Sequence, residues 1–176
     1  GGGLFHMAQL WVNLPAAQKK APPGYQALTA ADIPSVRLAE SAGFVRVIAG
    51  EFQGTRGPAK THTPMSVLDA RVSAGGGLEL SFPASYHLSL LVMQGELSVV
   101  GQRKVGLHDF VVFHKGTEAV LLEAASDAQL LILAGEPIGE PIVSYGPFVM
   151  NSEREILEAI RDFQSGRFGH LADNEG

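Results

Sequence analysis

The chain has 176 residues, 45% of them apolar, and a formal net charge of −5, which suits one folded domain with its own hydrophobic core. It contains no cysteine, so disulfides, zinc–thiolate sites and cysteine nucleophiles are excluded, and a cytoplasmic protein is expected. Basic residues occur at most in pairs, and no apolar run approaches the roughly 18 residues of a membrane helix. We therefore expect neither direct nucleic-acid binding nor a membrane segment.

The first 42 residues divide into two segments. An apolar run, "LFHMAQLWVNLP", contains the single tryptophan, Trp11, and we interpret residues 1–14 as a strand. Residues 15–42 carry four prolines and little periodicity. Because proline cannot donate a hydrogen bond to a β-ladder and the residue before it disfavours helix, this segment should cross over the sheet rather than join it.

Residues 43–150 contain short apolar runs that recur about every ten residues and end at glycine, proline or charged residues. Several alternate apolar and polar positions, which predicts strands with one face on a core and one face in water. Turns are expected at Gly75, Gly95, Gly101 and Gly116. The pattern predicts an all-β sandwich or barrel with strands over 44–52, 66–72, 78–82, 87–93, 96–100, 109–113, 119–124 and 128–135.

Residues 151–166 predict one helix, followed by a polar tail over 167–176. Ser152 and Glu155 form a capping box, and Gly166 can end the helix. An apolar stripe should lie on the sandwich; its members are Ile156, Ala159, Ile160 and Phe163. Before the helix, "EPI" occurs twice, at 136–138 and 140–142. We favour an extended segment stiffened by two prolines over the alternative, a paired-carboxylate site.

Small strands together with several histidines suggest a cupin, the jelly-roll barrel that often holds one metal. The first cupin motif, anchored on Gly95, places its ligand positions at Leu88 and within the stretch 81–84, where no residue can bind a metal. Anchored on Gly101, it keeps a single imidazole, His87. In the second motif, Ala119 or Thr117 occupies the histidine position. The sequence predicts a cupin jelly roll without catalytic, cofactor or metal residues.

The other histidines do not replace these ligands. His108 and His114 lie in one predicted strand, about 20 Å apart at ~3.3 Å per residue, so they cannot share an ion unless the chain turns between them. His6, His62 and His170 fall in segments that we expect to be exposed. Sequence motifs of serine hydrolases, dinucleotide-binding proteins and nucleotide-binding P-loops do not occur.

Three strings carry a family resemblance: "LWVNLP", "VRVIAGEFQGTRGPAKTHTP" and "GEPIGEPIVSYGPFVMN". They resemble the C-terminal half of a pirin-family protein; pirins are bicupins, which contain two cupin domains. The resemblance implies two cupin halves, the N-terminal one holding iron through three histidines and a glutamate. It also implies that residues 1–14 are the strand at the joint between the halves, and that this chain is the C-terminal half without the metal domain.

From this resemblance we expect a domain without metal or other cofactor that buttresses its partner, an N-terminal cupin half. Pirins are described as quercetin 2,3-dioxygenase-like enzymes in bacteria and as iron-dependent transcriptional co-regulators in animals, so one alternative is a scaffold within an iron dioxygenase. Another is a module whose barrel holds an apolar ligand against Leu90, Val92 or Val112. An isolated half should also self-associate through Leu10, Trp11 and Val12.

Overall fold

The structure is a computed structural model that describes residues 2–3, 6–99 and 103–169. By its internal contacts, the chain divides into two compact units. One unit comprises residues 25–137, and the other combines residues 1–24 with residues 138–176. In the described part of the chain, no helix is long and apolar enough to cross a membrane.

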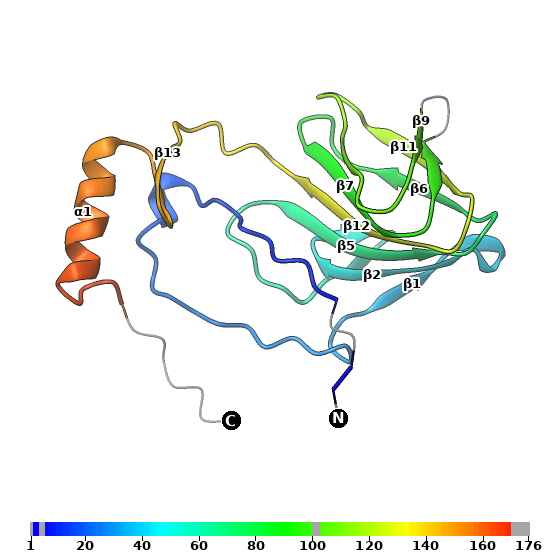
Figure 1. Cartoon of the computed structure of the whole chain (residues 1–176), viewed down its shortest axis with the longest axis horizontal. Helices are drawn as coiled ribbons and strands as arrows, with labels where there is room; N and C mark the ends of the chain where they lie inside the picture. Colours follow the sequence, from blue (N-terminus) through cyan, green and yellow to red (C-terminus); the bar gives the residue numbers. More distant parts are fainter. Residues whose placement is uncertain (1, 4–5, 100–102, 170–176) are drawn as a thin grey trace. The chain divides into compact units, whose positions relative to one another are not determined.

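The unit over residues 25–137 is a β-sandwich (Figure 1). Its larger sheet has six strands in the order β1-β2-β5-β12-β7-β10, and the smaller has four in the order β6-β11-β8-β9. All ladders between described strands are antiparallel. The strands span β1 Ser35–Arg37, β2 Gly43–Ala49, β5 Met65–Val72, β6 Gly77–Ser81, β7 His87–Gln94, β8 Leu97–Val99, β9 Arg103–Val105, β10 Phe110–Val112, β11 Ala119–Ala124 and β12 Ala128–Gly135. A small hairpin joins β3 Glu51–Phe52 to β4 Thr55–Arg56.

The hydrophobic core lies between the two sheets. In the larger sheet, Leu68, Leu90 and Ile132 are fully buried, and Leu80 and Leu122 face them from the smaller sheet. These residues fall on every second position of their strands, as a strand with one core face requires. The all-β prediction is therefore confirmed, and Gly75, Gly95 and Gly116 have the positive φ expected at turns; Gly101 lies outside the described residues.

Of the two predictions for the N-terminal segment, that of a joint strand over residues 1–14 stays a prediction, and that of a crossover over 15–42 which does not join the sheet is wrong. Described residues 2–3 and 6–14 form no strand, since no neighbouring strand hydrogen-bonds to them. The segment 15–42 does not merely cross over: after a short 3-10 helix at Ala16–Gln18, its β1 joins the edge of the six-stranded sheet by pairing with β2. A short strand that follows a proline-rich segment can form at the edge of a sheet, because an edge strand pairs with a neighbour on one side only.

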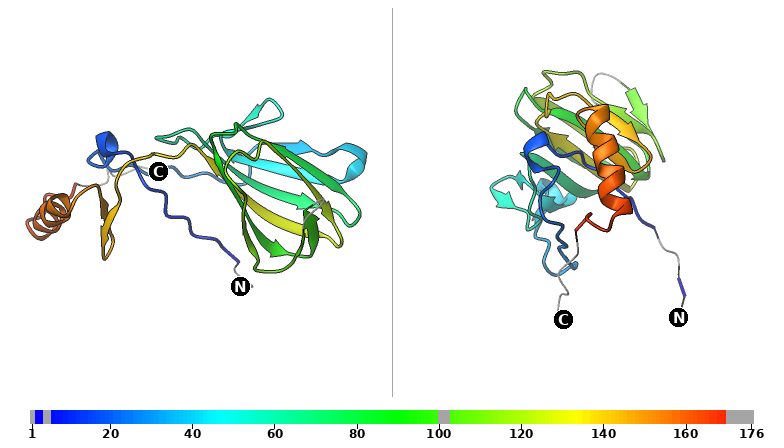
Figure 2. Two further views of the ribbon diagram at one scale, coloured as in Figure 1. Left: turned by 90° about the horizontal axis from the view of Figure 1, so that it is seen from above. Right: turned by 90° about the vertical axis from the view of Figure 1, so that its left-hand side faces the viewer.

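The other unit contains a hairpin and one helix. Strands β13 Val143–Tyr145 and β14 Phe148–Met150 pair with each other, and helix α1 spans Glu153–Gln164 (Figure 2). Ser152 caps the helix as predicted. At the other end, Gly166 (φ 72°) donates to the carbonyl of Phe163 and Arg167 donates to that of Asp162, which is the Schellman arrangement that favours glycine.

The apolar stripe of α1 packs on the hairpin formed by β13 and β14. Ile156 and Ala159 of this stripe are buried; that the stripe lies on the sandwich stays a prediction. Strands β13 and β14 have no clear sequence signal, because proline and glycine interrupt this short segment. The two "EPI" repeats lie in a segment without regular secondary structure between β12 and β13.

Candidate functional site

The outer side of the six-stranded sheet carries a row of apolar side chains. Val67 lies opposite Leu133, and Leu131 lies opposite Leu91, which lies opposite Phe110. All five point away from the core, because they alternate with its buried residues. We call these residues, Val67, Leu91, Phe110, Leu131 and Leu133, the outer apolar face.

Exposure differs across this face. Leu131 is buried although it does not belong to the core, whereas Phe110 is 57% exposed. Next to Phe110 on the same edge strand, Val112 is 69% exposed. Apolar residues on both faces are typical of sheets that are covered on both sides.

A polar cluster crosses three strands beside the outer apolar face. Arg46 on β2 lies directly opposite Asp69 on β5, with 3.5 Å between the Arg46 Nη1 and Asp69 Oδ2 atoms. Gln129 on β12 donates its side-chain amide to Asp69 Oδ1 at 3.1 Å. These groups are half-buried, so each depends on the others for its hydrogen bonds.

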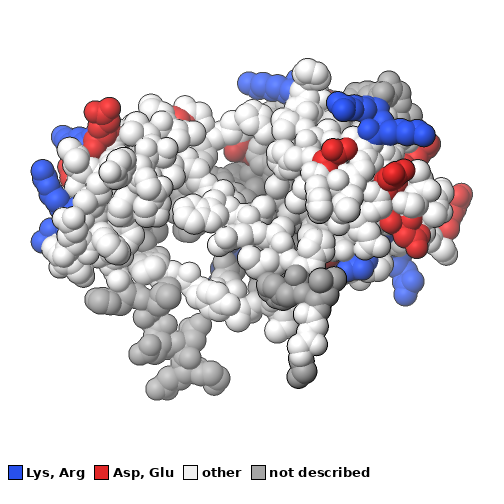
Figure 3. Space-filling model, in the orientation of Figure 1, with Lys and Arg blue, Asp and Glu red and all other residues white. Residues whose placement is uncertain are grey.

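The outer side of the four-stranded sheet has a different character. Glu79 lies opposite Leu121, and Ser98 lies opposite both Glu123 and Lys104. Leu121, which is 45% exposed, is flanked there by charged and hydroxyl side chains. On the face of the molecule shown in Figure 3, acidic and basic side chains are interspersed rather than gathered into a field of one sign. The polar outer side therefore needs no cover, unlike the outer apolar face.

In the unit formed by the two ends of the chain, polar contacts join the N-terminal segment to the hairpin. Glu140 Oε2 accepts hydrogen bonds from the backbone N–H of Ala16 at 2.7 Å and from the side-chain amide of Asn151 at 2.9 Å. The Lys19 ammonium donates to Asn13 and to the carbonyl of Val149. Glu140 thus joins the N-terminal segment to Asn151, just ahead of helix α1, through two hydrogen bonds. This geometry gives no support to a paired-carboxylate site.

Aromatic side chains gather in the same unit. Phe148, Phe163 and Phe168 pack edge to face, with ring centroids 5.6 to 6.3 Å apart. Phe148 and Phe168 also line a groove of about 840 Å³, together with Trp11. Trp11 is 74% exposed, and the other two residues predicted to drive self-association, Leu10 and Val12, are exposed as well. The predicted self-association residues therefore do lie together at an accessible surface.

The described histidines do not converge. His87 is exposed at the start of β7, and His114 lies in the turn after β10. His108 has a positive φ of 70° and precedes β10, which covers only residues 110–112. The prediction that His108 and His114 share one strand is therefore wrong, because the chain turns at both ends of β10. His6 and His62 are exposed, and His170 lies outside the described residues.

The residues at the cupin motif positions do not fit an iron ion. Leu88 and Phe82 are buried apolar core residues, and neither offers a lone pair to a metal. Across residues 6–99 and 103–169, no three His, Asp or Glu side chains lie close enough to hold an ion.

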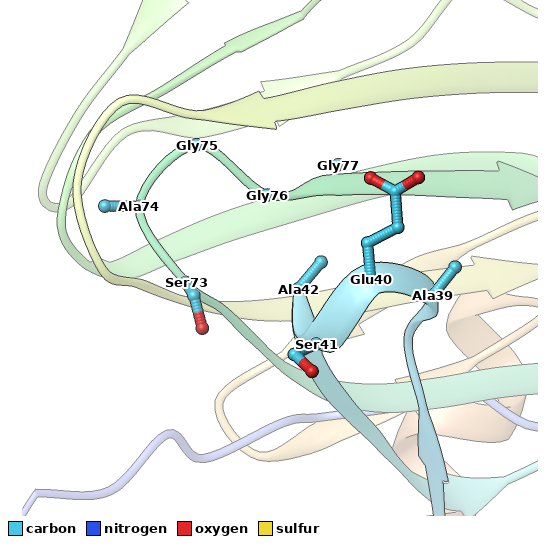
Figure 4. Close-up of a pocket in the computed structure, with 9 residues that line it drawn as sticks. All are labelled: Ala39, Glu40, Ser41, Ala42, Ser73, Ala74, Gly75, Gly76 and Gly77. Atoms are coloured by element: carbon cyan, nitrogen blue, oxygen red, sulfur yellow. The ribbon is translucent and has the colours of Figure 1, made fainter.

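The predicted apolar ligand cavity is not formed by the residues that we named. Leu90 and Val92 are packed in the core without exposure, and Val112 lies on the opposite side of the sheet. Another hollow, of about 320 Å³, lies between residues 39–42 and the turn 73–77 (Figure 4). Its one charged side chain is Glu40, and a lone carboxylate with no partner group performs no evident chemistry.

The functional surfaces were partly visible in the sequence. Residues 90–93 and 130–133 are continuous apolar runs rather than alternating ones. Such runs indicate strands buried on both faces; the sequence analysis assigned them to strands but did not use them to predict a second apolar face. The polar cluster of Arg46, Asp69 and Gln129 had no signal of this kind, since it is created by strand pairing.

Comparison with known proteins identifies relatives over most of the chain. The family model of the Pirin C-terminal cupin domain matches residues 67–169. A Pseudomonas aeruginosa protein named as a candidate quercetin 2,3-dioxygenase is 47% identical over 167 residues, covering 95% of this chain and 58% of its own length. Pirin-1 of Arabidopsis thaliana is 37% identical, with 92% of this chain and 57% of its own covered.

A solved structure agrees with the fold. The crystal structure of a quercetin 2,3-dioxygenase from Acinetobacter baumannii superimposes with a TM-score of 0.85 at 38% identity, covering 90% of this chain and 55% of that one. The cupin prediction is therefore confirmed. This chain spans less than two thirds of the length of each of these relatives.

Proposed function

This chain belongs to the pirin family, and we propose that it is the metal-free C-terminal cupin half that supports a metal-bearing N-terminal cupin half. Iron and its chemistry would belong to that other half, and the pair would work in the cytoplasm. Neither nucleic acid nor a membrane is a direct partner in this proposal.

The observation that carries the proposal is the outer apolar face. A second apolar side on a sheet needs cover, and interdomain contacts within a chain typically bury ~600 to 1,500 Å². The relatives are longer than this chain by enough to contain another cupin. The cluster of Arg46, Asp69 and Gln129 lies beside that face and would fix the register of the partner.

A second candidate function follows from the names of the relatives. Two of them are named for quercetin 2,3-dioxygenase activity, so the assembled protein would oxidise flavonols, with this half as the scaffold. This chain's own residues would contribute packing and orientation and no reacting group.

Assembly can be tested by mixing the separately produced N-terminal part of the Pseudomonas aeruginosa relative with this chain. Light scattering should detect a one-to-one complex. Phe110→Glu should abolish it, because a carboxylate would be buried in an apolar interface. Leu121→Glu, on the outer side of the other sheet, is the matched control and should leave assembly intact.

The same mixtures separate the two candidate functions. Iron analysis and quercetin turnover on the complex should locate iron in the N-terminal part, with activity dependent on it. A metal-loaded form of this chain alone that turns over quercetin would contradict the proposal. An assembled, iron-bound complex without turnover would leave the buttress role and remove the dioxygenase candidate.

A further inference from the structure

The groove of about 840 Å³ that is lined by Trp11, Phe148 and Phe168 is not used by the proposed function. Every residue that lines it belongs to the unit formed by the two ends of the chain. Small-molecule sites are typically hollows of this size, mostly apolar, with a few polar groups that orient the ligand. We call this feature the aromatic groove; its walls and its charges define the ligand that suits it.

The walls of the aromatic groove are largely aromatic and aliphatic. Its lining includes Trp11, which is 74% exposed, and the pair Phe148 and Phe168, whose ring centroids lie 5.6 Å apart. The buried side chain of Met150 also belongs to the lining. Aromatic rings pack favourably on other rings, offset or edge to face. A ligand with a flat ring therefore suits this surface.

The C-terminal end of α1 brings Phe168 to the groove. After the Schellman turn at Gly166, the chain leaves the helix, and Phe168 packs against Phe148 of β14. The next residue, Gly169, lies close to the N-terminal segment, since a Cβ added there would be 3.1 Å from Pro23. Contacts between segments far apart in the sequence thus build the groove, rather than a single loop.

The aromatic groove carries more positive than negative charge. Lys19, Lys20 and Arg167 line it, and Asp162 is the one acidic side chain among its described lining residues. Arg167 pairs with Asp162 at 3.2 Å, and Lys20 lies 3.8 Å from Glu158. This positive excess occurs in a chain whose net charge is −5, and it favours an anionic ligand over a cationic one.

Lys19 has no carboxylate partner among the described residues. Its half-buried ammonium donates to Asn13 Oδ1 at 2.7 Å and to the carbonyl of Val149 at 3.0 Å, two neutral acceptors that also line the groove. An ammonium has three N–H donors, and a charge withdrawn from water without a counter-charge costs free energy. A ligand carboxylate would supply both an acceptor for the third N–H and the missing negative charge.

We propose that the aromatic groove binds a small aromatic carboxylate, with its ring against Trp11 and Phe148 and its carboxylate on the Lys19 ammonium. The site uses no residue of the outer apolar face. It is therefore a separate proposal from assembly with an N-terminal half.

The test uses the fluorescence of Trp11, which is the single tryptophan of the chain and lines the groove. The 176-residue chain is titrated with phenylacetate, phenylacetamide and acetate, at a protein concentration where light scattering shows a monomer. Phenylacetate should give a saturable change. Phenylacetamide should bind about ten-fold more weakly because it lacks the charge, and acetate should not saturate because it lacks the ring.

Variants of the lysine test its role. Lys19→Met should weaken phenylacetate binding about ten-fold, the effect of one lost charge-assisted hydrogen bond, and should leave phenylacetamide binding unchanged. Lys19→Arg keeps the charge and should bind phenylacetate more tightly than Lys19→Met does. Lys115→Met removes an exposed lysine that does not line the groove and should bind as the original chain does. Circular dichroism checks that each variant is folded.

Three results would overturn the proposal. They are no saturable change with phenylacetate, equal affinities for phenylacetate and phenylacetamide, or unchanged phenylacetate binding in folded Lys19→Met. A Trp11 signal that changes with protein concentration and does not respond to phenylacetate would also contradict it, and would assign the groove to a second copy of the chain. None of these results bears on assembly with an N-terminal half, which is measured separately with Phe110→Glu.

Discussion

The two sheets of the sandwich share one core and differ in their outer sides. In the four-stranded sheet, Glu79 and Glu123 alternate with buried leucines, so its outer side is satisfied by water. In the six-stranded sheet, Leu131 and Leu133 flank the buried Ile132 and make the outer side apolar too. Substitutions at inner positions should therefore change the stability of the fold, whereas substitutions at exposed outer positions of the larger sheet should change the binding of a partner.

The largest expected effect comes from adjacent leucines in β11. Leu122→Ala should lower the free energy of unfolding by about 2–5 kcal/mol, since Leu122 is buried in the core. Leu121→Ala should change it by about 0.5 kcal/mol or less, as usual for a surface substitution. Urea denaturation followed by circular dichroism measures both.

The same experiment on β12 sharpens the contrast between the sheets. Leu131→Ala should cost about 2 kcal/mol or more, close to the loss for its inward neighbour Ile132→Ala, because Leu131 is buried on the outer side. If Leu131→Ala were as mild as Leu121→Ala, the two outer sides would be equivalent and the comparison would fail.

The polar clusters of the two outer sides should also respond differently. Asp69→Ala leaves the half-buried Arg46 and Gln129 without their partner and should cost about 1–3 kcal/mol. Glu79→Ala, on the exposed outer side of β6, is the control and should stay within about 0.5 kcal/mol. Equal losses in thermal or urea unfolding would show that the cluster contributes nothing specific.

Self-association of the isolated chain can show which of its two accessible apolar surfaces, the one around Trp11 or the outer apolar face, forms the contact. We expect a concentration-dependent dimer in light scattering, and Trp11→Ser should weaken it about ten-fold, or about 1.4 kcal/mol. Tyr25→Ser replaces an equally exposed aromatic residue and should have no effect. If Phe110→Glu abolished the dimer and Trp11→Ser did not, the outer apolar face would be the contact. A clean monomer would remove the prediction altogether.

Sequence reasoning succeeded where local patterns determine structure. Short apolar runs bounded by turn residues predicted β5, β7, β11 and β12 nearly to the residue, because each strand buries at least one face in the shared core. The capping box at Ser152 and the glycine at 166 fixed the ends of α1, since both depend on residues three or four positions apart. The positive φ at Gly95 followed from turn chemistry.

The remaining features depend on residues far apart in the chain. Strand β9 has three residues, and β13 and β14 also have three each, too few for periodicity to be read. Glu140 reaches the backbone of Ala16 across 124 positions, and no local pattern predicts that pairing. Ser66 looked like an ordinary strand serine until its register placed it among core residues.

The smallest expected effect concerns α1, which lies outside both sheets. The Ser152 hydroxyl donates to Glu155 Oε2 at 2.7 Å, and this hydrogen bond holds the pKa of Glu155 below its ordinary value of 4.5. A carboxyl whose pKa is lowered by folding stabilises the helix above its unfolded pKa and loses that contribution as the pH falls through the folded pKa.

Helix α1 should therefore fray at its first turn below about pH 4.5, while the sheets stay intact. Amide hydrogen exchange of residues 155–158 should accelerate as the pH falls, after correction for the intrinsic rate. Glu155→Gln should flatten this pH dependence, because its amide does not titrate, whereas Glu153→Gln in the same turn should preserve it. An unchanged pH profile in Glu155→Gln would mean that the capping box does not control the helix start, and equal fraying in the sheets would place the titrating group elsewhere.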